Sequence, residues 1–135
     1  MCGITGYIGH RDSVPVLLKG LRRLEYRGYD SAGIALLQDN KIAHLKKAGK
    51  VSDLQSLVDD SPIKGNCGIA HTRWATHGKP NDINAHPHLD QTGNIALVHN
   101  GIIENFETLE EVLINKGVLF TSDTASSILF RLILL

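Results

Sequence analysis

The chain has 135 residues, of which 42% are hydrophobic and 21% charged, and its formal net charge at pH 7 is zero. These values are typical of ordinary globular proteins, and the length suggests one domain at most. No basic stripe favours a nucleic-acid partner, and no apolar run reaches the ~20 residues of a membrane span. The sequence starts without the basic and apolar segments of an export signal, so we expect a cytoplasmic protein with free thiols at Cys2 and Cys67.

The first half of the chain alternates strands and helices. Residues 3–9 predict a short strand, and a helix with an apolar stripe follows, capped by Asp12 or Ser13 and ended by Gly28. Residues 32–38 predict a buried strand that turns at Asp39-Asn40 into a second strand, because such a turn favours a hairpin. A short helix capped by Ser52 comes next. The hairpin argues against a purely parallel sheet.

The second half contains one long stretch without periodicity. Residues 67–72 predict a strand, whereas residues 74–93 are rich in Gly, Pro and Asn and predict a functional or disordered loop. A strand over residues 94–100 and a helix ended by Gly117 follow. The last predicted helix, residues 126–135, is apolar almost all round, so it needs packing partners that the chain does not obviously supply. We therefore expect the fold to be truncated at the C-terminus.

Cys2 is the first candidate for chemistry. Removal of Met1 would leave one residue carrying both a thiol and a free α-amine, which are a nucleophile and a base. Its position alone favours an incidental small residue. Asn100-Gly101, after the predicted strand, offers a side-chain amide and an uncrowded backbone N–H, the two kinds of donor found in oxyanion holes. A plain Asn-Gly turn is the simpler explanation.

Further polar residues gather at the ends of predicted elements. Arg73 has the planar fork that clamps a carboxylate, and Trp74 and His77 begin the long loop. Arg27 lies in a polar cluster after the first helix, where it could merely compensate the helix dipole. Asp123 could bind an ammonium group or cap the last helix. The seven histidines follow no standard spacing of zinc ligands, so we expect no metal.

Five stretches, in order, carry a resemblance to a known family: MCGI, EYRGYDSAGIA, HTRWATHG, NAHPH and HNGIIEN. Together they resemble the class II glutamine amidotransferases, and within them the branch that aminates hexose phosphates. The likeness runs from residue 1 to about residue 124. Each stretch is weak alone, but the ordered set is specific. After Ser122 the chain departs from the family pattern, and a shift of one residue is needed to match Asp123.

The resemblance implies an α+β fold of the N-terminal-nucleophile type, an αββα sandwich of antiparallel sheets between helical layers. It implies that Cys2 attacks the side-chain amide of L-glutamine and that Asn100 and Gly101 hold the oxyanion. It also implies that Arg27 lies near the nucleophile. The glutamine-binding residues would be Arg73, Trp74, His77 and Asp123.

The activity implied is hydrolysis of glutamine to glutamate and ammonia, as the amide-donating half of a larger enzyme. Residues 1–135 would then be the N-terminal part of the amidotransferase domain, and a sugar-phosphate isomerase region would be its partner. We expect no cofactor, no nucleic acid and no membrane partner. The alternative is an inactive truncated fragment or a glutamine-binding module of the same ancestry.

Overall fold

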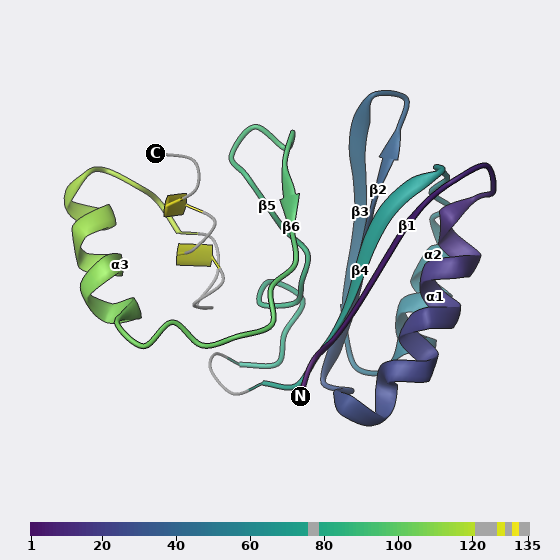
Figure 1. The fold of residues 1–135 in the computed structure, drawn as a ribbon, viewed down its shortest axis with the longest axis horizontal. Coiled ribbons are helices and arrows are strands. Elements are labelled where there is room, and N and C mark those ends of the chain that lie inside the picture. The colour runs from purple at the N-terminus through teal and green to yellow at the C-terminus, as the bar shows by residue number, and fades with distance from the viewer. Residues whose placement is uncertain (76–78, 121–126, 129–130, 133–135) are drawn as a thin grey trace.

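One antiparallel sheet of four strands organises the N-terminal part of the protein. The computed structural model describes residues 1–75, 79–120, 127–128 and 131–132. The sheet has the order β1-β4-β2-β3, formed by β1 (Gly3–Ile8), β2 (Ser31–Gln38), β3 (Lys41–Ala48) and β4 (Cys67–Arg73). Two helices lie against one face of the sheet, and a hairpin of two short strands, β5 (His88–Leu89) and β6 (Ala96–Leu97), lies on its other side (Figure 1).

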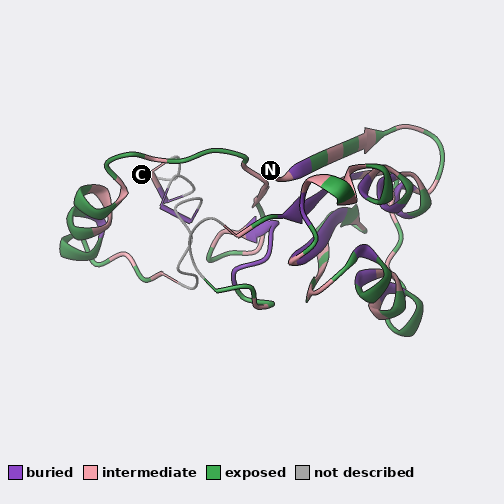
Figure 2. Cartoon of the chain, turned by 90° about the horizontal axis from the view of Figure 1, so that it is seen from below, coloured by how far each residue is buried: buried purple, intermediate pink, exposed green. Residues whose placement is uncertain are grey.

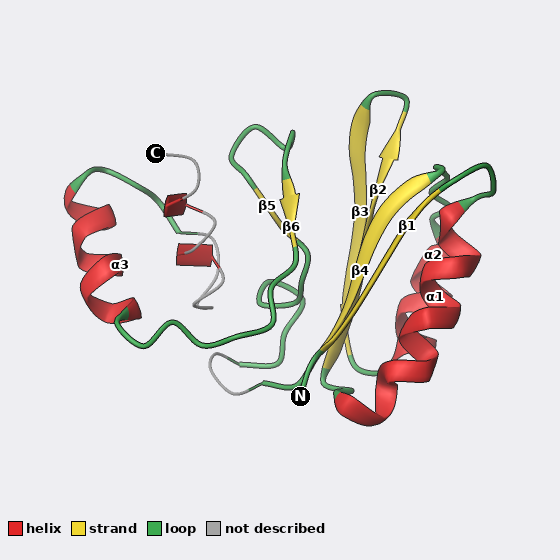
Figure 3. Cartoon of the chain, in the orientation of Figure 1, coloured by secondary structure: helices red, strands yellow, loops and turns green. Residues whose placement is uncertain are grey.

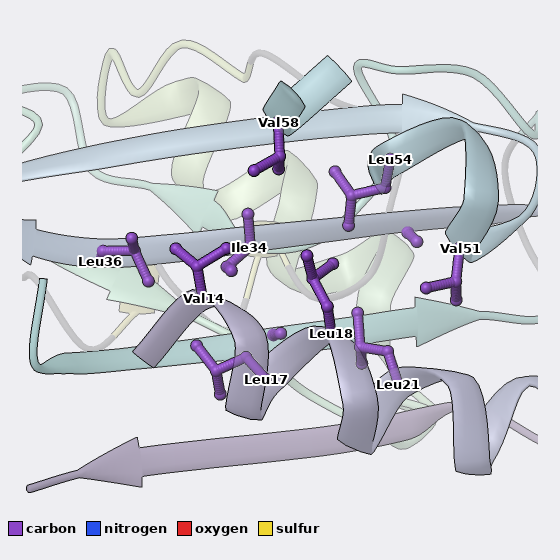
Figure 4. Close-up of a cluster of buried hydrophobic side chains, with 11 residues drawn as sticks. Val14, Leu17, Leu18, Leu21, Ile34, Leu36, Val51, Leu54 and Val58 are labelled. Atoms are coloured by element: carbon purple, nitrogen blue, oxygen red, sulfur yellow. The ribbon is translucent and has the colours of Figure 1, made fainter. Parts of the chain in front are cut away.

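The main core lies between the sheet and the helices α1 (Ser13–Leu24) and α2 (Val51–Asp60). The apolar stripe predicted for the first helix faces this core, and α1 contacts β1 and β4 while α2 contacts β3. Figure 4 shows the side chains of both helices pointing toward the central strands. The cluster consists of Val14, Leu17, Leu18, Leu21, Ala32, Ile34, Leu36, Val51, Leu54, Val58 and Ala70.

Acidic side chains accept hydrogen bonds from backbone N–H groups at the N-termini of both helices. Asp12 caps α1, since its Oδ1 accepts from the backbone N–H of Val14 at 3.3 Å. After Leu24 the helix tightens into the 3-10 turn η1 (Glu25–Arg27), and the chain leaves the helix at Gly28 as predicted. The prediction that Ser52 caps the next helix is wrong, because α2 starts at Val51, whose N–H donates to Glu25 Oε1 at 2.8 Å.

The predicted hairpin is confirmed by the structure. Asp39 and Asn40 have φ of 50° and 61°, the left-handed pair that a tight turn between antiparallel strands requires. β2 lies between β4 and β3 and is buried over its first six residues, which explains its continuous apolar sequence. Figure 2 shows the buried centre of the sheet and the more exposed helix α3 (Phe106–Asn115).

The remaining described segments lie on the other side of the sheet (Figure 3). β5 (His88–Leu89) pairs antiparallel with β6 (Ala96–Leu97), and α3 (Phe106–Asn115) follows and ends before Gly117, whose φ is 81°. The segment before β5 packs closely on β2, because a Cβ added to Gly33 would lie 2.0 Å from the carbonyl oxygen of His86.

Two predictions about this second layer need correction. The strand predicted over residues 94–100 is only two residues long, and the stretch 74–93, predicted without an element, contains β5. The reason is a turn around Asp90, whose carboxylate accepts from the N–H groups of Asn94 and Ile95 at 2.7 and 2.8 Å and so delays the strand. Of the last predicted helix, residues 127–128 and 131–132 are helical and the others lie outside the described residues.

Candidate active site

Cys2 lies at the end of the sheet, beside the last residues of β4. The pairing of β1 with β4 places Gly3 opposite Thr72, so the preceding Cys2 lies next to the Arg73-Trp74 peptide. The backbone N–H of Trp74 donates to Cys2 Sγ at 3.3 Å. The sulfur of Cys2 is therefore in contact with a backbone hydrogen-bond donor. Cys2 is half-buried, and the side chain of Met1 is exposed.

The Arg73-Trp74 peptide is held from two directions. The backbone N–H of Asp30 donates to the Arg73 carbonyl at 3.1 Å, and the Asp30 carboxylate accepts from the N–H of Ala75. Gly28 packs directly on the same peptide, because an added Cβ would lie 2.8–2.9 Å from the Arg73 carbonyl carbon and oxygen and the Trp74 nitrogen. These contacts fix the direction in which the Trp74 N–H points.

Asn100 reaches Cys2 from the loop after β6. Its Nδ2 donates to the Cys2 carbonyl oxygen at 3.2 Å, across 98 positions of sequence. An amide nitrogen carries two hydrogens, so the second one remains for another acceptor near Cys2. Gly101 follows directly, and an added Cβ there would lie 2.7 Å from the ring nitrogen Nε2 of His99. The structure thus brings Cys2 and Asn100 together, and Gly101 is the next residue of the chain.

The two predicted arginines differ in their surroundings. Arg73 is buried, with 4% of its surface exposed, and its Nη1 donates to the Lys79 carbonyl at 3.2 Å. Arg27 lies close in space to the first residue of the chain, since its Nη2 is 3.8 Å from the sulfur of Met1. The Nε of Arg27 is buried and has no hydrogen-bond partner among the described residues.

Trp74 is 44% exposed at the start of the long loop. Its ring meets the ring of Tyr29 edge to face, with the centroids 5.4 Å apart. The indole of Trp74 thus contacts the ring of Tyr29, while the backbone amide of Trp74 contacts the sulfur of Cys2. His77 and Asp123, the other two predicted glutamine-binding residues, lie outside the described residues.

Three buried histidines lie between the sheet and the β5–β6 hairpin. The rings of His71 and His86 are 4.3 Å apart, and those of His86 and His88 are 4.4 Å apart. Burial lowers the pKa of His71 to about 4 and that of His88 to about 3, and it also lowers the pKa of His86. In the part of the chain that the structure describes, no cluster of three His, Cys, Asp or Glu residues could hold a metal ion.

Two residues with clear roles in this geometry were not among the predicted site residues. Asp30 holds the peptide beside Cys2, and the Nε2 of His71 is 2.7 Å from the Oδ1 of Asn100. Both occur in the quoted stretches EYRGYDSAG and HTRWATHG. Spacing could not single them out, because their partners are distant in the sequence and become neighbours only in the folded structure.

Comparison with known proteins was made against protein families, curated proteins and solved structures. Residues 18–127 match the family described as "Glutamine amidotransferases class-II". The chain belongs to the class II glutamine amidotransferases. It is 56% identical over 134 residues to the glutamine–fructose-6-phosphate aminotransferase [isomerizing] of Bacteroides thetaiotaomicron. The enzyme of the same name from Pyrococcus horikoshii is 56% identical over 133 residues.

The similarity of this amidotransferase chain to a solved structure extends to its three-dimensional fold. The glutamine phosphoribosylpyrophosphate amidotransferase from B. subtilis superposes with a TM-score of 0.86 at 29% identity, over 98% of this chain and 29% of that one. The predicted α+β fold of the N-terminal-nucleophile type is therefore confirmed. The two aminotransferases are matched over 98% of this chain but only 22% of their own length. No helix among the described residues is long and apolar enough to cross a membrane.

Proposed function

We propose that this amidotransferase chain hydrolyses the side-chain amide of L-glutamine, with Cys2 as the nucleophile. The observation that carries the proposal is the meeting of three groups from distant parts of the chain. The Sγ of Cys2 accepts from the Trp74 N–H at 3.3 Å, and the amide of Asn100 lies 3.2 Å from the Cys2 carbonyl oxygen. A thiol that accepts from a backbone N–H, with a side-chain amide donor held beside the same residue, suits acyl transfer through a thioester.

The base in this proposal is the α-amine of Cys2 itself. While Met1 is attached, the nitrogen of Cys2 belongs to a peptide bond and cannot take up a proton. Removal of Met1 would free an amine with a pKa of about 7.7–8.0, close to the ~8.5 of a thiol. The amine could then accept the thiol proton near neutral pH and return it during the reaction.

The reaction would run in two halves. The thiolate attacks the amide carbon of glutamine, and the resulting oxyanion is held by the Asn100 Nδ2 and the Gly101 N–H. The C–N bond breaks as the ammonium of Cys2 gives its proton to the leaving nitrogen, so ammonia departs and a thioester remains. Water, losing a proton to the same amine, attacks the thioester, and its collapse releases glutamate and restores the thiol.

The other proposed residues bind or enclose the substrate. The guanidinium of Arg73 would clamp the α-carboxylate of glutamine, since a planar fork matches a carboxylate. Trp74 would help to close the site from the exposed start of its loop. Arg27, whose buried Nε has no partner among the described residues, would act beside the N-terminus. By resemblance alone, His77 would also bind glutamine and Asp123 would take its α-ammonium group.

We also propose that this chain is the amide-donating part of a larger enzyme. The two relatives named above are glutamine–fructose-6-phosphate aminotransferases, and this chain spans 22% of their length. Residues 1–135 would be the N-terminal part of the amidotransferase domain. A sugar-phosphate isomerase region would receive the ammonia for amino-sugar synthesis. A cytoplasmic location suits the two free cysteines.

The test is glutamate release from glutamine by the purified chain, together with its intact mass. We expect the mass of a chain without Met1, and glutamate release that is lost in Cys2→Ala. Cys67→Ala is the matched control, because Cys67 is the other free cysteine and lies at the far end of β4. It should keep the activity of the parent chain.

Two results would count against the proposal. Equal glutamate release from Cys2→Ala and the parent would show that another group is the nucleophile. A processed, folded chain that binds glutamine in calorimetry but releases no glutamate would support the alternative, a glutamine-binding module or inactive fragment of the same ancestry.

A further inference from the structure

The side chain of Asn100 is held by two partners with opposite requirements. Its Nδ2 is 3.2 Å from the carbonyl oxygen of Cys2, and its Oδ1 is 2.7 Å from the Nε2 of His71. The backbone around Asn100 follows β6 without regular secondary structure, and the residue is exposed. The amide therefore depends on these two contacts, rather than on packing in a helix or strand, for its orientation.

The first contact determines how the second must be made. A carbonyl oxygen only accepts hydrogen bonds, so the NH₂ group of Asn100 must face Cys2. The Oδ1 atom then faces His71, and since it too only accepts, the Nε2 of His71 must carry a hydrogen and donate it. The neutral tautomer with the proton on Nε2 satisfies this bond, and the buried Nδ1 of His71 has no hydrogen-bond partner among the described residues.

We propose that His71 is a positioning residue for the oxyanion hole: its Nε2–H fixes the amide of Asn100 so that the NH₂ group faces the reacting carbonyl. The proposal rests on the glutaminase function proposed above. An amide turned by 180° would present Oδ1 to the developing negative charge and repel it. An amide that is already oriented need not rearrange during the reaction. Preorganised donors stabilise the transition state because they avoid this cost.

The surroundings of His71 suit this role. The side chain is 0% exposed in the buried end of β4, and the ring of His86 lies beside it at an angle of 36°, with the ring centroids 4.3 Å apart. Burial lowers the pKa of His71 to about 4, in spite of the bond to Asn100, and the charge of Arg73 also lowers it. The ring is therefore neutral at the pH where the amine of Cys2 would act. It donates a hydrogen bond to Asn100 there but does not act as a general acid.

The experiment compares three replacements of His71 in the full chain. His71→Gln keeps a donor at nearly the position of Nε2, whereas His71→Leu removes it and His71→Asn is too short to reach. We expect kcat for glutamate release to fall about 10²-fold or more in the Leu and Asn variants, the loss typical of one oxyanion donor, with little change in KM. The Gln variant should recover most of this loss.

A double-variant cycle separates positioning from general destabilisation. If His71 acts through Asn100, His71→Leu should add little to the loss caused by Asn100→Ala. If the fold losses of kcat in the two single variants multiply in the double variant, the proposal is overturned. A kcat of His71→Leu equal to that of the parent would also overturn it. His86→Leu is the matched control, because it changes the neighbouring ring without touching Asn100, and it should keep the kcat of the parent.

A second measurement does not depend on activity. The ¹⁵N shifts of the His71 ring report its tautomer, and we expect a neutral ring protonated on Nε2 from pH 5.5 to 8. A proton on Nδ1 would overturn the inference even in an active chain. If the parent chain releases no glutamate while Nε2–H is observed, the proposed function fails and the orientation of Asn100 by His71 stands.

Discussion

Acid should destabilise this protein through its three buried histidines. His71, His86 and His88 are 0%, 4% and 5% exposed, and burial lowers the pKa of each in the folded state. Below pH 6.5 the unfolded chain therefore binds more protons than the folded one. The free energy of unfolding therefore has its full value above pH 6.5, which is about the pKa of a histidine in the unfolded chain. It decreases as the pH falls from there toward the lower pKa of each histidine in the folded protein.

The size of the effect follows from the linkage between protonation and unfolding. An unfolded histidine with a pKa of about 6.5 carries roughly 0.9 of a proton at pH 5.5 and roughly 0.1 at pH 7.5. With the folded rings neutral at both values, each histidine lowers the free energy of unfolding by about 1.4 kcal/mol over this interval. Three of them together give about 4 kcal/mol, against the 5–15 kcal/mol, roughly, of a typical domain.

Urea unfolding followed by circular dichroism at pH 7.5 and 5.5 measures this difference, and His86→Leu tests its origin. Both ring nitrogens of His86 are buried and lack a partner among the described residues, so an apolar side chain of similar size should be tolerated at pH 7.5. The variant should lose about 1.4 kcal/mol less than the parent on acidification. A loss equal to that of the parent, or a parent whose stability does not change with pH, would refute the reasoning.

Three further substitutions probe the site and the core. Gly28→Ala should displace the Arg73-Trp74 peptide, since the new Cβ would lie 2.8–2.9 Å from its atoms. Slower alkylation of Cys2 by iodoacetamide would then show that the hydrogen bond from the Trp74 N–H to the Cys2 sulfur is lost. Arg73→Ala should raise KM for glutamine about tenfold or more with kcat little changed, and an unaltered KM would exclude the proposed clamp. Leu54→Ala, in a fully buried position, should lower the free energy of unfolding by about 2–5 kcal/mol in urea titrations, and a smaller loss would mean that the core collapses around it.

The sequence predicted the helix-and-sheet layer well because each of its elements carries a local signal. The apolar stripe of α1 has helical spacing, and Asp39-Asn40 is a pair suited to the left-handed turn between β2 and β3. The start of α2 was missed because its first N–H is satisfied by Glu25 from η1, a tertiary contact. The short strand β5 was missed because two residues show no periodicity.

The candidate site was only partly predictable for the same reason. Cys2, Asn100 and Arg73 could be named from their residue types and from the family resemblance. Asp30 and His71 act through partners that are 45 and 29 positions away, so their roles appear only in the folded structure. A histidine on a buried strand is otherwise indistinguishable from one used for packing.

The location of Cys2, the proposed nucleophile, directly before β1 has a structural consequence. Among the residues that the structure describes, β1 is an edge strand of the sheet and pairs only with β4. That same strand supplies the Trp74 amide at its end and His71 within it, so one strand pairing sets the distance of Cys2 from both. A terminal amine would ordinarily fray, and the ladder from Gly3 to Ile8 opposes this. The pairing of β1 with β4 therefore makes it feasible for a chain terminus to carry both nucleophile and base.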